Sequence, residues 1–295
     1  MNTLESVKRK LETAEDLQSV VKTMKAMAAV SIRQYEQAVA SLVHYSRAIE
    51  LGFQVALQGR DFIPAPFNPT EEGQLGAILF GSSQGMCGQF NEQIAWYALK
   101  QIKQIQPDSA RRRLISLGLR AIAHLEDSGQ SVEEVFTLPG SIGEIKWSVQ
   151  ELLIKIEQWR LEGKVDQIIL FFNKKQANSS YVPTQQFLLP VDLNWLRNLK
   201  EKKWDSRSQP MFTLSWEKLF SDLVQHYFFF QLYHAFAESL ASENASRLAA
   251  MQAAEKNIDE QLNELSDQYN RQRQSAITSE LLDIVSGFEA LETAR

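Results

Sequence analysis

The residues best suited to chemistry gather in one short turn, Gly81 to Gly88, which reads Gly-Ser-Ser-Gln-Gly-Met-Cys-Gly. Glycine-rich turns that follow a strand can bind nucleotide phosphates through backbone N–H groups. A dinucleotide fingerprint would need glycine where Ser83 and Met86 stand, and a P-loop would need a lysine that does not follow. The turn therefore favours tight helix–strand packing over nucleotide binding.

Nucleophiles and metal ligands are sparse in this chain. Cys87 is the single cysteine, which excludes an internal disulfide. Beside two glycines its thiol is most simply a small core side chain, with a reactive thiol as the alternative. His226 and His234 lie eight residues apart without a cysteine or carboxylate that would complete a ligand set. We therefore expect no catalytic residue, no cofactor site and no metal site.

Composition describes a folded protein with an uneven charge distribution. The 295 residues are 44% hydrophobic and 23% charged, with a net charge of −5. Residues 1–51 carry seven Lys/Arg against six Asp/Glu, whereas residues 213–295 carry six against thirteen. The acidic end argues against nucleic acid as a partner, because a phosphate-binding surface is basic. This acidic face is either solvated or paired with Lys8, Arg9 and Lys10, and the sequence favours the solvated face.

Membrane spans and targeting signals are not expected. No apolar run reaches the ~20 residues that a spanning helix needs, and residues 1–8 enter helical periodicity without a signal-like pattern. The Phe228-Phe229-Phe230 patch is flanked by polar residues and is expected to pack against protein. We expect the protein to stay in the compartment where it is made.

The elements that position these residues begin with two long helices, one at each end. Residues 3–51 and 211–286 contain neither proline nor glycine. At about 1.5 Å of rise per residue they would be roughly 70 and 110 Å long, longer than a compact domain is wide. Both ends are therefore expected to leave the body of the protein together.

Heptad spacing predicts that these helices pair. Uncharged residues occupy seven successive heptad positions of the first helix: Val7, Ala14, Val21, Ala28, Tyr35, Leu42 and Ile49. The second helix has an apolar face at three- and four-residue steps: Leu248, Met251, Ile258, Leu262, Leu265 and Tyr269, then Ile277, Leu281, Ile284, Phe288 and Leu291. Such seams are typical of coiled coils. We expect an antiparallel pair whose last segment, from about Ser275, stays uncovered and binds a partner.

The middle of the chain alternates strand and helix patterns. Strands are expected at 76–81, 114–117, 132–138, 165–172 and 181–189, with the last at a sheet edge because of its flanking prolines. Helices are expected at 91–106 (with Asn91 as N-cap), 120–126 and 142–162. The fold class is thus α/β: an antiparallel coiled coil of long N- and C-terminal helices with a central Rossmann-like α/β domain. The expected domains are residues 1–58, 74–210 and 211–291.

This layout resembles the gamma subunit of F-type ATP synthases. The segment 21–29 is similar to the family's Thr-Lys-Ala-Met-x-Met-Val-Ala stretch, and 85–91 is similar to its Gly-Leu-Cys-Gly-Gly-x-Asn turn. Residues 182–190 match its fifth-strand region. Two blocks of the last helix, 240–251 and 269–287, carry the most specific likeness, and the resemblance covers essentially the whole chain.

The resemblance implies a central rotor shaft without catalytic residues or cofactors of its own. In that family the shaft stands inside a ring of alpha and beta subunits, and its foot rests on the epsilon subunit and the membrane c-ring. Its rotation couples ion flow to conformational change at the catalytic beta subunits, in ATP synthesis or ATP-driven proton or sodium transport. A peripheral position at the cytoplasmic face of a bacterial cell membrane follows from the same likeness.

The resemblance also implies the residues that bind partners. Those expected to meet the mobile loops of beta are Met24, Lys25, Arg247, Arg271, Arg273, Gln274, Thr278 and Glu280. Those expected in the hydrophobic sleeve at the far end are Ile284, Val285, Phe288 and Leu291. For each polar residue the alternative is an ordinary solvated helix face.

The chain departs from the family pattern at several points. Ser83-Gln84 replaces the family's Asp-Arg, and the segment after Trp204-Asp205 lacks the usual aromatics, which puts c-ring contacts there in doubt. These departures suggest a divergent bacterial branch. Two other functions stay open from the residues alone: a coiled-coil adaptor or scaffold with an α/β partner-binding head, and an α/β enzyme with helical arms.

Overall fold

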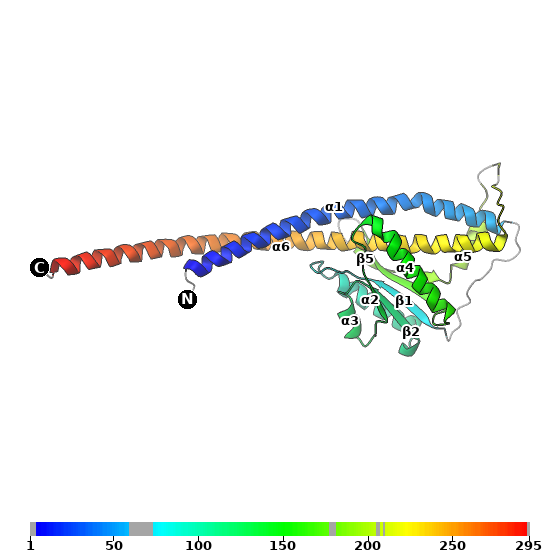
Figure 1. Cartoon of the computed structure of the whole chain (residues 1–295), viewed down its shortest axis with the longest axis horizontal. Coiled ribbons are helices and arrows are strands. Elements are labelled where there is room, and N and C mark those ends of the chain that lie inside the picture. Colours follow the sequence, from blue (N-terminus) through cyan, green and yellow to red (C-terminus); the bar gives the residue numbers. More distant parts are fainter. Residues whose placement is uncertain (1–3, 59–72, 177–180, 205–206, 209, 294–295) are drawn as a thin grey trace. The chain divides into compact units, whose positions relative to one another are not determined.

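Two long helices lie at the ends of the chain. Each helix is unbroken at the residues where the chain divides into two compact units. A computed structural model describes residues 4–58, 73–176, 181–204, 207–208 and 210–293, with side chains to residue 286. Helix α1 spans Leu4–Leu57 and α6 spans Trp216–Thr293. The chain divides into a terminal unit, residues 1–27 with 248–295, and a central unit, residues 28–247. Figure 1 shows the elements of each.

Helix α1 extends past Gly52, the glycine that follows residues 3–51, which contain neither proline nor glycine. A Cβ on Gly52 would lie 2.5 Å from Cδ2 of Leu223 in α6. Glycine costs about 1 kcal/mol inside a helix, but here it lets two helices approach closely. Helix α6 likewise extends past Gly287. It begins at Trp216, five residues after the start of the stretch 211–286 that contains neither proline nor glycine.

In the terminal unit, the two chain ends form an antiparallel pair. Val21, Met251 and Ile258 are buried together, and Met24 and Leu262 pack against them. Across the pair, Gln18 Nε2 donates to Asp259 Oδ1 at 2.5 Å, and Lys25 forms an ion pair with Glu255. The numbers rise along one helix as they fall along the other, so the helices are antiparallel. This confirms the predicted coiled coil.

The same pairing holds within the central unit. Tyr45 Oη and His226 Nδ1 are 2.9 Å apart, and Trp216 Nε1 donates to the carbonyl of Ala56 at 2.6 Å. The seven predicted heptad positions of α1, in both units, are all buried or half-buried. Phe228 is buried in the core, as the sequence predicted for its aromatic patch.

A five-stranded sheet occupies the centre of this unit, in the order β3-β2-β1-β4-β5. Its strands are β1 (Leu75–Phe80), β2 (Arg112–Leu117), β3 (Glu134–Phe136), β4 (Gln167–Lys175) and β5 (Tyr181–Leu189). Strands β1 to β4 pair in parallel, and β5 pairs antiparallel with β4. Strand β5 lies at the edge, as its prolines predicted.

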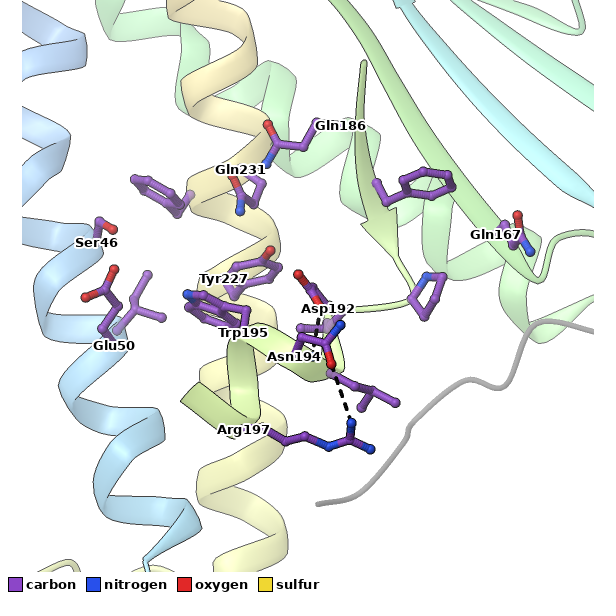
Figure 2. Close-up of a pocket in the computed structure, with 16 residues that line it drawn as sticks. Ser46, Glu50, Gln167, Gln186, Asp192, Asn194, Trp195, Arg197, Tyr227 and Gln231 are labelled. Carbon is purple, nitrogen blue, oxygen red and sulfur yellow. Dashed lines mark hydrogen bonds between the residues drawn. The ribbon is translucent and has the colours of Figure 1, made fainter. Parts of the chain in front are cut away.

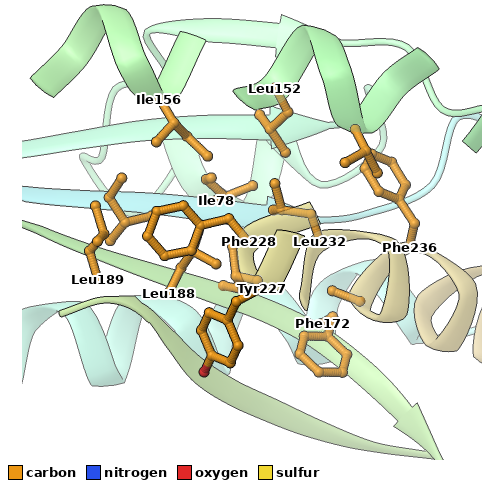
Figure 3. Close-up of a cluster of buried hydrophobic side chains, with 14 of the residues drawn as sticks. Ile78, Leu152, Ile156, Phe172, Leu188, Leu189, Tyr227, Phe228, Leu232 and Phe236 are labelled. Carbon is orange, nitrogen blue, oxygen red and sulfur yellow. The ribbon is translucent and has the colours of Figure 1, made fainter. Parts of the chain in front are cut away.

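Each face of the sheet is covered by a separate apolar cluster. The larger one joins the sheet to α1, α6 and α4 (Ile142–Leu161). Figure 3 shows Phe228, Leu232 and Phe236 of α6 beside Ile78 of β1, with Leu152 and Ile156 of α4 pointing inward. The other cluster packs α2 (Phe90–Ile105) and α3 (Ile122–Glu126) on the opposite face.

Three local features differ from expectation. Gln89, not Asn91, precedes the first helical residue of α2, and the Asn91 side chain instead hydrogen-bonds the preceding turn. Helix α5 (Leu193–Glu201) was not predicted, and it is capped by Asp192 Oδ1, which accepts from Asn194 N at 2.8 Å. The short 3-10 helix η1 (Ser109–Arg111) was not predicted either.

Gly118 provides a sharp test of the packing where strand β2 ends. Its φ is 88°, and a Cβ there would lie 2.6 Å from backbone atoms of Ser82. Gly129 has a φ of 78° but no atom within 4 Å of its added Cβ. Gly129→Ala should cost only the ~1–2 kcal/mol of a left-handed alanine. Gly118→Ala should cost roughly 1–3 kcal/mol more, because the backbone must shift.

Urea unfolding of both variants, followed by circular dichroism, measures this difference. Equal losses in the free energy of unfolding would show that the turn at Ser82 is not packed as described.

Candidate partner-binding sites

The glycine-rich turn is held by a buried polar cluster rather than open to a ligand. Ser82 N donates to Asn91 Oδ1 at 2.9 Å, and Asn91 Nδ2 donates to Ser82 Oγ at 2.8 Å. The Ser82 hydroxyl in turn donates to the carbonyl of Gln84 at 2.8 Å. Cys87 is buried beside them, with Asn91 Nδ2 3.3 Å from its sulfur. No base among the described residues activates this hydroxyl, so the cluster positions the turn.

Side chains of helix α6 also form hydrogen bonds to this turn. Ser246 Oγ donates to the carbonyl of Cys87 at 2.6 Å, and Arg247 reaches the carbonyl of Gln84 at 3.4 Å. One turn earlier, Ser242 Oγ donates to the carbonyl of Asn173 in β4 at 2.9 Å. A single segment of α6 thus binds both the Gly81–Gly88 turn and strand β4. We call Ser242, Glu243, Ser246 and Arg247 the α6 latch.

Arg247, a predicted partner-binding residue, is buried within the central unit. Its Nη2 lies 2.7 Å from Glu243 Oε1, and both side chains are 7% exposed. Burial raises the pKa of Glu243, and Arg247 offsets that rise only in part. Within the described residues, Arg247 Nε is buried without a hydrogen-bond partner. In the turn whose Gln84 carbonyl Arg247 contacts, Ser83, Gln84 and Met86 are exposed.

Met86 stands out on that turn. Its φ is 59°, a left-handed conformation that is unfavourable for a side chain of this size, and the side chain is 61% exposed. Strained, exposed residues of this kind are found at contact sites. Met86 was not among the predicted partner-binding residues.

The predicted residues of the terminal unit fall into two groups. Met24 and Lys25 are half-buried, with Met24 in the seam and Lys25 bound to Glu255. The residues of α6 from 271 to 285 that were predicted to meet partners are exposed: Arg271, Arg273, Gln274, Thr278, Glu280, Ile284 and Val285. The side chains of Phe288 and Leu291 lie outside the described residues.

The exposed segment presents more apolar surface than the prediction contained. Ile277, Leu281, Ile284 and Val285 are 49–66% exposed, and Leu282, which was not predicted, is 60% exposed. Thr278 Oγ1 donates to the carbonyl of Gln274 at 2.9 Å, a bond within the helix. A contiguous apolar face of this kind normally marks a binding surface.

A groove of about 930 Å³ in the central unit was not anticipated. Figure 2 shows its wall: Ser46 and Glu50 from α1, Tyr227 and Gln231 from α6, and Trp195 and Arg197 from α5. Gln186 of β5 donates to Gln231 at 2.6 Å, and the Trp195 and Tyr227 rings are 5.0 Å apart. Aromatic walls with a few polar groups suit the side chains of a protein partner.

None of the helices among the described residues has the length and apolar character to cross a membrane. No group of three or more His, Cys, Asp or Glu side chains in the described ranges could hold a metal ion.

Comparison with known proteins identifies the family. The family described as ATP synthase matches residues 3–291. The ATP synthase gamma chain of Bdellovibrio bacteriovorus is 26% identical over 99% of this chain and 100% of its own length. That of Heliobacterium modesticaldum is 27% identical over 98% and 99%.

The fold is shared with solved structures as well. A chain from the cryo-EM structure of the Euglena gracilis mitochondrial ATP synthase, comprising OSCP, F1 and the c-ring, gives a TM-score of 0.67 at 17% identity, covering 99% of this chain and 95% of that chain. Because the match covers almost every residue, the chain belongs to the ATP synthase family, and within it to the gamma chains.

Proposed function

We propose that this chain is the central rotor shaft of an F-type ATP synthase. It couples ion flow through the membrane c-ring to conformational change at the catalytic beta subunits, in ATP synthesis or ATP-driven transport of protons or sodium. The observation that carries the proposal is the antiparallel pairing of the two chain ends, followed by an exposed apolar segment of α6. As a gamma chain it is a noncatalytic subunit.

The mechanism is mechanical: the rotation of the shaft is coupled to the conformation of each beta subunit, because the contacts differ between its conformational states. A ligand or partner shifts a conformational equilibrium only by its difference in affinity for the two states. A shaft whose surface differs around its circumference presents each beta subunit with a different face as it turns. The exposed segment of α6 has such a surface, because Ile277, Leu281 and Ile284 lie along one face of the helix, whereas Ser279 and Asp283 lie on another.

The contacts follow from the chemistry of each surface. Arg271, Arg273, Gln274, Thr278 and Glu280 offer charged and polar groups to the mobile loops of beta. Ile284 and Val285 offer an apolar surface to the sleeve at the far end of the alpha–beta ring, where the sequence also predicts Phe288 and Leu291. An apolar surface can turn in such a sleeve without breaking specific hydrogen bonds.

Arg247 would act on the beta loops together with the turn that it holds. Its guanidinium binds the Gln84 carbonyl, so it keeps Ser83, Gln84 and Met86 in place for a partner. Lys25, bound to Glu255, would present its remaining surface beside Met24. In this scheme the buried cation and the exposed turn form one contact surface.

The central unit would meet the epsilon subunit and the c-ring, which places the chain at the membrane only through partners. The groove between α1, α5, α6 and β5 supplies a concave aromatic surface for such a partner. In a bacterial cell this position is peripheral, on the cytoplasmic face of the membrane.

Coupling in the assembled complex tests this proposal. Arg247→Ala should lower the number of ions transported per ATP hydrolysed more than it lowers the amount of complex that assembles with alpha and beta. Loss of a charged hydrogen bond worth about 1.5–3 kcal/mol predicts a roughly 10-fold effect or more. Purified complexes in vesicles, assayed for ATP hydrolysis and ion uptake, give both numbers.

The exposed Arg33 of α1 provides the control, since Arg33→Ala removes the same charge without touching the latch. Unchanged transport per ATP in Arg247→Ala would show that Arg247 takes no part in coupling. Failure of the wild-type chain to assemble with alpha and beta would remove the rotor proposal itself.

The buried ion pair also predicts a pH dependence. The pKa of Glu243 is raised above its ordinary 4.5, so the folded state binds this proton more readily than the unfolded state and stability falls as pH rises above 4.5. Arg247→Ala removes the compensating charge and should cost ~3–5 kcal/mol near pH 7. Part of this loss should return when the pH is lowered from 7 to 5, because the folded state takes up a proton at Glu243 more readily than the unfolded state does.

Urea unfolding at the two pH values measures this effect. The double variant Glu243→Gln/Arg247→Ala should lack the extra pH dependence. A loss in Arg247→Ala that is the same at both pH values would contradict the buried carboxylate as its cause.

A further inference from the structure

Helix α4 is apolar on two opposite faces, and the fold uses one of them. Ile145, Val149, Leu152, Ile156 and Trp159 are buried against the sheet. Figure 3 shows Leu152 and Ile156 directed into this cluster. A surface helix of a globular protein ordinarily carries charged and polar residues on its other side.

The other side of α4 instead carries a row of large apolar side chains. Trp147, Ile154 and Leu161 are 58%, 61% and 82% exposed. They are seven residues apart, close to two helical turns, so they lie in one line along the helix. Single exposed apolar residues are common on protein surfaces, but here three recur at heptad spacing along one face of the helix. We call these three residues the α4 stripe.

Acidic residues border the stripe. Glu144, Glu151, Glu157 and Glu162 are exposed beside it. Glu144 accepts a hydrogen bond from Gly140 N, Glu162 pairs with Lys164, and Glu157 lies near Arg160. Glu151 is exposed, with no ion pair among the described residues.

Basic groups also lie near the stripe. Lys146 lies over the Trp147 ring of the stripe at 4.6 Å, Arg160 is exposed beside Leu161, and Lys155 pairs with Glu134. The C-terminal end of the helix, at Leu161, adds the negative end of the helix dipole. The border formed by Glu144, Glu151 and Glu162 is therefore acidic, whereas Lys146 and Arg160 lie along the opposite border.

We propose that the α4 stripe binds an amphipathic helix of a partner protein, with apolar residues at heptad spacing and Lys or Arg beside them. Successive anchors of the stripe are about 10.5 Å apart along α4, the spacing that a second helix presents at every seventh residue. The acidic border selects basic flanks. It also disfavours the anionic membrane surface that a basic stripe would attract. This surface belongs to the central unit alone and does not depend on the rotor proposal.

A designed peptide tests the recognition chemistry on the full chain. The probe is a fluorescein-labelled 21-residue helix with Leu at heptad positions a and d and Lys at e and g. Its counterpart has Glu at e and g. Fluorescence anisotropy should show the Lys peptide binding at least ~10-fold more tightly than the Glu peptide. Ile154→Ser should weaken the Lys peptide by about 10-fold, the effect of losing one buried aliphatic side chain.

Leu119→Ser is the matched control, because Leu119 is 65% exposed but lies outside α4. It should leave binding unchanged. The double variant Glu151→Lys/Glu157→Lys should reverse the preference between the two peptides. Equal losses in Ile154→Ser and Leu119→Ser, or equal binding of the two peptides to the unmodified chain, would overturn the proposal.

Vesicles separate a protein partner from a membrane. Sedimentation of the full chain with phosphatidylglycerol vesicles should give the same bound fraction for the unmodified chain and Ile154→Ser. Vesicle binding that Ile154→Ser abolishes would overturn the proposal in favour of a membrane-facing stripe.

Discussion

The antiparallel apolar seam between α1 and α6 is the interaction on which the structure depends. Most helical stability in proteins comes from packing an apolar face rather than from helix propensity. In the terminal unit that packing is supplied by Val21 against Met251 and Ile258, with few other buried side chains to help. In the central unit the same two helices also form one wall of the core. The seam therefore pairs the two ends of the chain. The strands of the sheet come from the residues between α1 and α6 in the sequence.

The second constraint is polar and lies within the central unit. The α6 latch binds the carbonyls of Cys87, Gln84 and Asn173, so the sheet is tied to α6 by directional bonds as well as apolar packing. Apolar packing tolerates small rotations, whereas buried hydrogen bonds penalise them strongly. The buried Glu243–Arg247 pair adds a cost for separation, because either charge alone would be left buried.

The spacing of apolar residues and the positions of proline and glycine predicted much of this fold, because both act locally along the chain. The heptad positions of α1 are buried or half-buried, and the prolines around β5 place it at the sheet edge. Asn91 was assigned as a cap because caps are recognised by residue type, but its side chain found a tertiary partner in Ser82. The burial of Arg247, the groove at Trp195 and the exposure of Met86 depend on which distant segments meet. No local pattern contains that information. The assignment of individual partner-binding residues stays a prediction.

A cross-link within the terminal unit tests the central claim, that the paired helices work as one body. In a Cys87→Ser background, Gln18→Cys and Asp259→Cys place two thiols where the side chains now share a hydrogen bond. A short bis-maleimide should join them in the assembled complex, and ATP-driven ion transport should continue at the rate of the untreated complex. Loss of transport on cross-linking, or no cross-link at all, would contradict a shaft made of two helices that turn together.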